Sequence, residues 1–334
     1  MITQNKTSRD LTEEEQSEII FQHAENNDKY KKLCNNVKEA IEQFLEKAEL
    51  SYLTVHYRIK DFSSILSKVK RKRYQNVFDE CEDTCGVRII CYFQDDIEKI
   101  NAIIKKEFEI INTSNLISGS EKFGYRSYHF VVKIKKAWTN APNYRGLENL
   151  KIEIQVRTVL MHAWAEIEHK LAYKRREHIP VELRRTFSKI SLKLEEADEQ
   201  FENLRESMSS YKKNARENIL KKDFKADVNL DNLQALLDAF FPTRKKDIKN
   251  TSGLLDDILK HGFSMSNLAG WLAKNSRSIS NLEKEVFFSD NKEFFAQIGA
   301  ARMSIVLGND EYMREILPSE IISRVEEFKA KHSI

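Results

Sequence analysis

The stretch LKIEIQVR, residues 150–157, alternates strictly between apolar and polar side chains. A two-residue period of this kind is typical of a β-strand with one buried face. Its polar positions, Glu153, Gln155 and Arg157, therefore fall in a row on the face opposite the core. We predict a half-buried strand here, followed by a helix over 158–174.

That helix carries a stripe of polar and aromatic side chains. Spacings of four, three and four residues place His162, Glu166, His169 and Tyr173 on one side of it. Two interpretations stay open, namely direct contact with a bound substrate and a helix that packs on the sheet with its polar groups satisfied. His169 is the better candidate for substrate contact.

Further strands and helices are predicted upstream of this unit. The stretch SYLTVHYRIK, residues 51–60, alternates and places His56, Arg58 and Lys60 on its polar side. GVRIICYF, residues 86–93, is a nearly continuous apolar run and indicates a buried strand. The other predicted elements are helices over 61–74 and 95–108 and a strand over 127–134.

After Pro180, apolar residues recur at alternating intervals of four and three across four heptads. This pattern predicts a long helix that pairs with a second copy of the chain or lies on its own domain. From about residue 227, shorter apolar clusters punctuated by Gly and Pro favour a separate helical domain. The heptad positions are Leu183, Phe187, Ile190, Leu194, Ala197, Phe201, Leu204, Met208 and Tyr211.

Together these elements predict an α+β protein with a mixed sheet flanked by helices. Only 9 Gly and 4 Pro in 334 residues, with 32% charged residues, favour long solvated helices. The expected organisation is an N-terminal helical segment (1–45), a mixed domain (46–178), a long heptad-patterned helix (179–222) and an all-helical C-terminal extension (227–334).

Composition excludes several classes of protein. A net charge of +3 does not indicate a DNA-binding protein, so any basic surface must be local. No apolar run is long enough for a membrane span and the start is polar, so we expect a cytoplasmic protein with no membrane partner. The spacing of Cys34, Cys81, Cys85 and Cys91 fits neither a zinc site nor a disulfide framework, and buried reduced thiols are expected.

Basic and acidic side chains gather at predicted strand ends and on the first helix. Cations combined with two carboxylates suggest a phosphate site with bound Mg²⁺, because phosphoryl chemistry depends on charge neutralisation and positioning. Any one of these residues alone is usually a solvated strand or helix face. The set comprises Arg58, Lys60, Lys68, Arg88, Asp83 and Glu153.

Four motifs, in this order, resemble those of RelA/SpoT-type alarmone synthetases: RIKDFSSILSK (58–68), EDTCGVRI (82–89), GYRSYH (124–129) and EIQVRTVLMHAWAEIEHKLAYK (153–174). The resemblance covers about residues 45–215. It implies a nucleotidyltransferase-like sheet on which the 3′-hydroxyl of GDP or GTP attacks the β-phosphate of ATP and takes the pyrophosphate, releasing AMP.

The resemblance also implies roles for individual residues. Asp83 and Glu153 would be catalytic and hold Mg²⁺, and Glu153 would orient or deprotonate the attacking hydroxyl. ATP would be bound by Arg58, Lys60, Ser64, Lys68 and Arg88. The acceptor nucleotide would be contacted or supported by Tyr125, His129, Gln155, Arg157 and His169.

Several alternatives stay open at this stage. A toxic relative would transfer the same pyrophosphate to the 3′ end of tRNA, using basic clusters such as KVKRKR and YKRREH. A catalytically inactive nucleotide-binding module is a second alternative. We expect no hydrolase activity, because residues 1–45 do not resemble a His-Asp metal hydrolase, and we expect a homo-oligomer formed through 183–211. The chain resembles a small alarmone synthetase with an extension, and three roles stay open for that extension: an inhibitory lid, a sensor of a partner or signal, or a stabilising subdomain.

Overall fold

The computed structural model describes residues 11–72, 74, 77–117, 126–171, 180–287 and 295–334. The chain divides into two compact units, 1–204 and 205–334. Helix α6 (Val181–Leu220) contributes to both units. Each unit is described by itself below.

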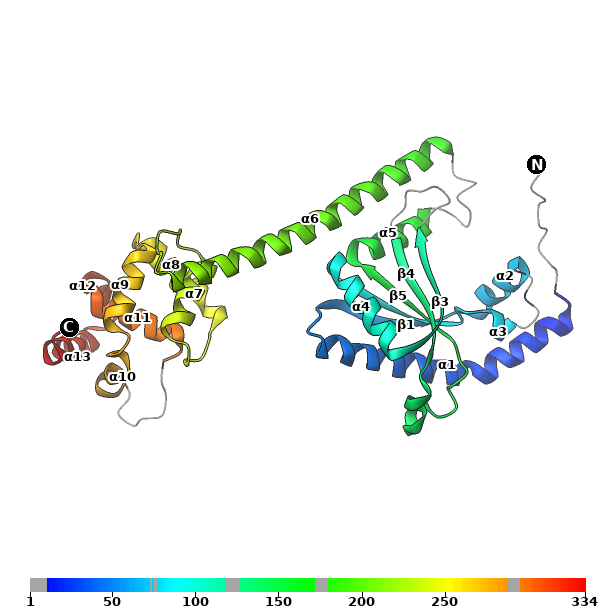
Figure 1. Ribbon diagram of the computed structural model, residues 1–334, viewed down its shortest axis with the longest axis horizontal. Helices are drawn as coiled ribbons and strands as arrows, with labels where there is room; N and C mark the ends of the chain where they lie inside the picture. The colour runs from blue at the N-terminus through cyan, green and yellow to red at the C-terminus, as the bar shows by residue number, and fades with distance from the viewer. Residues whose placement is uncertain (1–10, 73, 75–76, 118–125, 172–179, 288–294) are drawn as a thin grey trace. The chain divides into compact units, whose positions relative to one another are not determined.

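The first unit contains a five-stranded mixed sheet with the order β1-β2-β5-β4-β3 (Figure 1). The central β2–β5 pair is parallel and the other neighbouring pairs are antiparallel. The strands are β1 (Tyr52–Ile59), β2 (Cys85–Cys91), β3 (Phe108–Ile117), β4 (Arg126–Ile134) and β5 (Ile152–Thr158). This mixed sheet and its flanking helices confirm the predicted α+β class.

The sheet has one apolar face and one polar face. Along β5, the side chains of Ile152, Ile154 and Val156 are fully buried, as the alternation predicts. They share a core with apolar residues of helices α1 (Glu13–Lys47) and α4 (Gln94–Glu107). The polar residues of the same strands consequently project from the opposite face.

The other helices of this unit are α2 (Phe62–Lys72), α3 (Val77–Glu80) and α5 (Val159–Leu171), with short 3₁₀ turns at Lys136–Asn140 and Pro142–Tyr144.

Strand β3 is the element that the sequence pattern does not predict. Its middle contains Asn112, Ser114 and Asn115, residue types that favour turns when considered locally. Pairing with β4 along its length, with an irregularity between Ile110 and Asn112, holds these residues in a strand. Tertiary pairing outweighs local preference at this position.

Thr158 joins β5 to α5 and to the long helix α6. Its hydroxyl accepts a hydrogen bond from the Met161 N–H at 3.1 Å and donates one to the Asp198 carboxylate at 2.6 Å. Both Thr158 and Asp198 are buried. We expect Thr158→Val to lower the free energy of unfolding by about 2–4 kcal/mol, because it removes a helix cap and a hydrogen bond to a charged group.

Urea unfolding followed by tryptophan fluorescence measures this change. Thr113→Val, at an exposed position of β3, is the matched control and should behave like the wild type. Equal unfolding midpoints for the Thr158 variant and the wild type would show that this contact contributes nothing.

The second unit is helical. Its core joins the end of α6, through Ala215 and Ile219, to the helices that follow. These are α7 (Leu230–Phe240), α8 (Ile248–Lys260), α9 (Met265–Asn275), α10 (Ile279–Leu282), α11 (Gln297–Gly308), α12 (Asp310–Ile316) and α13 (Ser319–His332), with a π-helical turn at Glu283–Phe287. The all-helical character predicted for this region is confirmed for the residues described.

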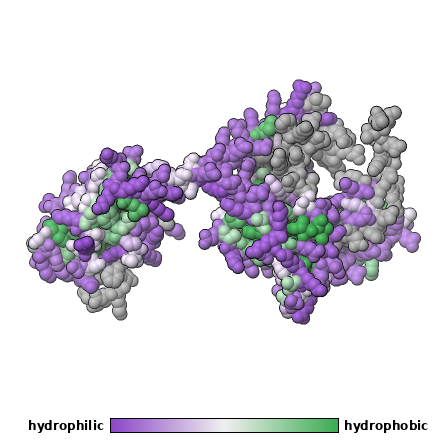
Figure 2. Space-filling model, viewed as in Figure 1, coloured by the Kyte–Doolittle hydropathy of each residue, from purple (hydrophilic) through white to green (hydrophobic). Residues whose placement is uncertain are grey.

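The surfaces of both units are largely hydrophilic in the view of Figure 2, with smaller hydrophobic patches. Within the described ranges, no helix combines the length and apolar character needed to cross a membrane. All four cysteines are buried and free, as expected from their spacing.

Candidate functional site

A pocket of about 530 Å³ opens on the polar face of the sheet. It gathers side chains from β1, β2 and β5 and from helices α2 and α5. Strand register explains the gathering, since His56, Arg88 and Gln155 are cross-strand neighbours, as are Arg58, Gly86 and Glu153. The lining residues are His56, Arg58, Lys60, Ser64, Asp83, Gly86, Val87, Arg88, Glu153, Gln155, Glu166 and His169.

Most residues singled out in the sequence come together here. Arg58, Lys60, Ser64, Asp83, Arg88, Glu153, Gln155 and His169 line the pocket. Lys68 and His129 contact lining residues directly, and Arg157 is linked to Glu153 through Ser127 and His129. Tyr125 and Tyr173, with the whole of the YKRREH cluster and part of the KVKRKR cluster, lie outside the described residues.

Asp83 lies in the turn before β2 and is held by two lysines. The Lys60 ammonium is 2.6 Å from its Oδ2 and the Lys68 ammonium is 2.7 Å from its Oδ1. Burial alone would raise the pKa of Asp83, but the two lysines outweigh it and lower that pKa to about 2. The carboxylate is therefore ionised at neutral pH.

Glu153 receives a hydrogen bond on each carboxylate oxygen. His129 Nδ1 lies 2.7 Å from Oε1, and Gln155 Nε2 donates to Oε2 at 2.8 Å. Burial acts to raise the pKa of Glu153, yet the interactions with His129 and Gln155 hold it below its ordinary value. This second carboxylate of the pocket is also ionised at neutral pH.

Positive charge is concentrated around Arg88. Its guanidinium donates to Gln155 Oε1 at 3.2 Å and pairs with Glu166 at 2.9 Å. Burial, followed by the charge of Arg88, lowers the pKa of both His56 and His162. The positive charge of Arg88, which contributes to both shifts, suits an anionic ligand such as a polyphosphate.

The side-chain carboxylate of Asp61 caps the N-terminus of α2. Asp61 accepts hydrogen bonds from the Ser64 N–H at 2.9 Å and the Ser64 hydroxyl at 2.8 Å. These bonds and one from the Ser63 hydroxyl lower the pKa of Asp61. The Asp61 carboxylate therefore already accepts the N–H group of Ser64 at this helix end, although Ser64 still lines the pocket.

Sequence reasoning did not assign several pocket residues. His56 shares the polar side of β1 with Arg58, and Glu166 lies on the predicted stripe of α5. The periodicity of the sequence therefore places both residues beside residues that were assigned to the site. Gly86 was not considered for the site. A β-carbon at this position would come within 3.1 Å of the Glu153 carbonyl oxygen, so glycine allows the close approach of β2 to β5.

The donor set of the pocket fits Mg²⁺. This ion is usually held by one or two carboxylates together with substrate phosphates. Asp83 and Glu153 both line the pocket and both are ionised, as such ligands must be. Asp83 has two lysine neighbours and Glu153 has two hydrogen-bonding neighbours, and these two carboxylates are the groups that would hold the ion together with a polyphosphate.

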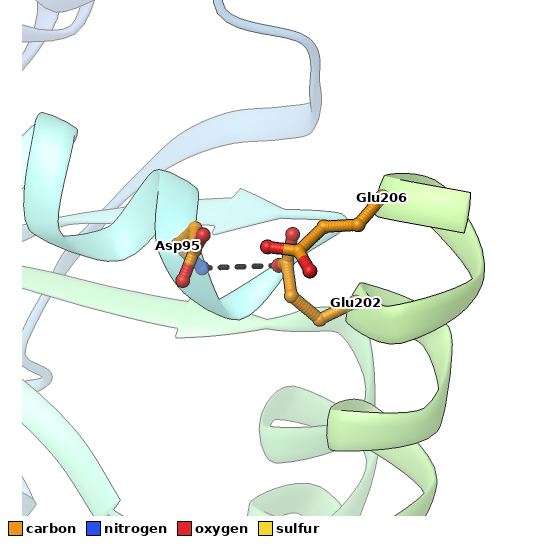
Figure 3. A group of neighbouring side chains, drawn as sticks. All are labelled: Asp95, Glu202 and Glu206. Atoms are coloured by element: carbon orange, nitrogen blue, oxygen red, sulfur yellow. Dashed lines mark hydrogen bonds between the residues drawn. The ribbon is translucent and has the colours of Figure 1, made fainter. Parts of the chain in front are cut away.

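Acidic residues also gather away from this pocket, at the start of α4 and along α6 (Figure 3). The Asp95 N–H donates to Glu202 at 3.2 Å, and Glu206 follows one turn later on the same helix. Exposed carboxylates group in this way without a metal, and the hydrogen bond to the helix N–H explains the position of Glu202.

Comparison with known proteins adds independent information on this region. Residues 57–178 match the family model described as "Region found in RelA / SpoT proteins". This range contains the lining residues from Arg58 to His169. It ends before α6 and the second unit.

Curated and solved proteins show the same similarity. The chain is 34% identical over 163 residues to GTP pyrophosphokinase YjbM of Bacillus subtilis, covering 48% of this chain and 72% of that protein. It is 35% identical over 132 residues to GTP pyrophosphokinase YwaC of the same organism, covering 38% of this chain and 60% of that protein. The crystal structure of small alarmone synthetase 1 from Bacillus subtilis aligns over 54% of this chain and 94% of that one, with 28% identity and a TM-score of 0.46.

Proposed function

Because this chain belongs to the RelA/SpoT family and is a GTP pyrophosphokinase, we propose that it transfers the pyrophosphate of ATP to the 3′-hydroxyl of GDP or GTP. The products would be a guanosine 3′-diphosphate alarmone and AMP. The observation that carries the proposal is a pocket in which the ionised carboxylates of Asp83 and Glu153 lie among arginine and lysine side chains.

The donor half of the pocket is built around Asp83. Lys60 and Lys68 contact this carboxylate, and Arg58 and Ser64 line the pocket beside them. In the proposed complex the ATP phosphates become the partners of the two lysines. Arg88, on the neighbouring strand, binds the adenine ring or the phosphates, because a guanidinium both stacks on rings and pairs with phosphate.

The acceptor half is built around Glu153. The ionised carboxylate takes the proton of the 3′-hydroxyl as the hydroxyl oxygen forms a bond to the β-phosphorus of ATP. The bond between that phosphorus and the oxygen bridging it to the α-phosphate breaks, and AMP leaves with the bridging oxygen. Gln155 and His169 line this pocket and are assigned to acceptor binding, together with Tyr125.

Magnesium completes the proposed site. Asp83 and Glu153 are the residues that would hold it. When bound, the ion neutralises charge on the transferring phosphates. The residues of the chain bind the nucleotides, orient the hydroxyl and accept its proton.

We propose synthesis without hydrolysis for residues 1–334. The described part of the N-terminal segment supports this proposal, because residues Glu13–Lys47 form the single helix α1. Its apolar residues pack in the core of the sheet. Incubation of purified protein with the alarmone and Mn²⁺ or Mg²⁺ should release no pyrophosphate.

The transfer itself is tested with γ-labelled ATP and Mg²⁺, supplied separately with GDP, GTP or deacylated tRNA. Nucleotides and RNA are then resolved for transferred label. We expect label on the guanosine nucleotides. Label on tRNA alone would replace this proposal by the tRNA-modifying alternative, and binding of ATP without any transfer would favour an inactive nucleotide-binding module.

We also propose that two copies of the chain associate through residues 183–211. Phe187 and Leu194 of the heptad stripe pack against the core of the first unit. Other stripe residues are exposed, among them Leu204 (56%) and Met208 (51%). An exposed apolar stripe at heptad spacing is typical of a helix that pairs with another helix.

Leu204→Glu is expected to shift the protein towards the monomer, because a charge in the apolar stripe opposes helix pairing. Sedimentation velocity measures the change. Ser210→Glu, an exposed substitution on the same helix outside the stripe, should sediment like the wild type. A monomeric wild type, or a Leu204 variant with unchanged sedimentation, would contradict the proposed interface.

A further inference from the structure

A chain of hydrogen bonds reaches Glu153 from behind the pocket. Arg157 Nε donates to the Ser127 hydroxyl at 2.8 Å. That hydroxyl lies 2.9 Å from His129 Nε2, and His129 Nδ1 lies 2.7 Å from Glu153 Oε1. Ser127 and His129 belong to β4, whereas Arg157 and Glu153 belong to the neighbouring strand β5.

The two ends of this chain fix its direction. A guanidinium can only donate hydrogen bonds and an ionised carboxylate can only accept them. Because the Glu153 oxygen can only accept, the hydrogen bond to it requires the ring proton on His129 Nδ1. In the neutral ring Nε2 is then an acceptor, and the Ser127 hydroxyl, which accepts from Arg157 on its oxygen, donates its single proton to this nitrogen.

The surroundings keep this arrangement in place. His129 is only 8% exposed, and Arg157 does not line the pocket. Burial and the nearby charge of Arg88 lower the pKa of Arg157 to about 10, so it stays a cation at neutral pH. The opposite oxygen of Glu153 is reached by a parallel chain, from Arg88 through Gln155.

We propose that Ser127 is a positioning residue, which selects the Nδ1–H form of His129 and thereby orients the Glu153 carboxylate towards the attacking hydroxyl. The proposal deepens the function proposed above and rests on the role given to Glu153. It also assigns Arg157 to anchoring this series of hydrogen bonds, which supports the acceptor site, in place of direct contact with the acceptor nucleotide. Ser127 touches neither nucleotide in this account and acts only through His129.

The first test reads the imidazole proton directly. Protein labelled with ¹⁵N-histidine is examined by NMR at a pH where the ring is neutral, and the His129 signals are identified by their loss in His129→Gln. We expect only the Nδ1–H form in the wild type and a mixture of both forms in Ser127→Ala. A wild-type Nε2–H form, or an unchanged Nδ1–H form in Ser127→Ala, would overturn the proposal.

The second test measures steady-state kinetics. Ser127→Ala should lower kcat roughly 10- to 100-fold, the usual effect of removing a group that orients a catalytic residue, with KM for ATP little changed. Ser127→Thr keeps the hydroxyl and should restore most of kcat and the single Nδ1–H form. Thr113→Ala removes a hydroxyl from exposed β3 and is the control for general effects on the sheet.

These two readouts separate failure of the inference from failure of the proposed function. If the wild type transfers no pyrophosphate, the proposed function is wrong. The NMR result still tests the direction of the hydrogen bonds between Arg157 and Glu153. If the wild type is active and Ser127→Ala keeps its kcat, Ser127 does not position Glu153 and the inference is wrong.

Discussion

Replacing Glu153 by glutamine is expected to lower kcat for pyrophosphate transfer by roughly 10²- to 10⁴-fold, the usual effect of losing a general base. Glutamine keeps the size of the side chain but can neither accept the proton of the hydroxyl nor supply a negative charge. The fold should persist, because His129 and Gln155 still face polar atoms at this position. Transfer of label from γ-labelled ATP measures the rate.

Glu109→Gln provides a matched control for this substitution. Glu109 is an exposed carboxylate on β3 and lies outside the pocket lining. Its variant should keep wild-type kcat and KM. If Glu153→Gln retains activity within a factor of a few, Glu153 does not act on the hydroxyl and the proposed mechanism needs another base.

Asp83→Asn should produce the second largest loss. We expect kcat to fall roughly 10²- to 10³-fold, because metal-ion stabilisation of phosphoryl charge contributes several kcal/mol. The Mg²⁺ concentration needed for half-maximal rate should also rise. Activity of Asp83→Asn with an unchanged Mg²⁺ dependence would exclude Asp83 as a metal ligand.

The same substitution should destabilise the protein in a pH-dependent manner. Lys60 and Lys68, with side chains 19% and 16% exposed, lose the carboxylate between them. A folded pKa of about 2, against an ordinary value of 3.8, corresponds to about 2 kcal/mol of stability at neutral pH. Because the pKa is lowered on folding, this contribution is present above the ordinary pKa and is lost as pH falls towards 2.

Thermal unfolding of wild type and Asp83→Asn at several pH values checks this expectation. The difference in stability should be largest near neutral pH and should shrink as pH falls from the ordinary pKa of 3.8 towards the folded pKa of about 2. A difference that stays constant from neutral to acid pH would show that the ion pairs do not cause it.

Much of the pocket was predictable because its residues stand in four compact motifs. Alternation alone places Glu153 and Gln155 on the open face of a strand, and it places Arg58 and Lys60 on the polar side of another. Residue type indicates phosphate and metal chemistry. The roles given to individual residues stay predictions until the variants above are measured.

Contacts between distant residues were not predictable in the same way. Lys60 and Lys68 were expected to hold phosphates, but nothing local shows that both contact Asp83. Ser127 drew no assignment, because a serine two residues before a histidine has no distinctive pattern. Its position between Arg157 and His129 depends on the pairing of β4 with β5.

The sequence by itself determined the helices and strands with strong periodicity, the heptad pattern of α6 and the chemical types gathered in the motifs. It could do so because side-chain direction repeats every two residues in a strand and about every 3.6 in a helix, and such repeats are local. Only the tertiary structure decided that β3 is a strand, which heptad residues of α6 lie against the core, and which charges meet around Asp83 and Glu153. Those features depend on strand order, register and burial, which bring together residues far apart along the chain and so leave no periodic signal in it.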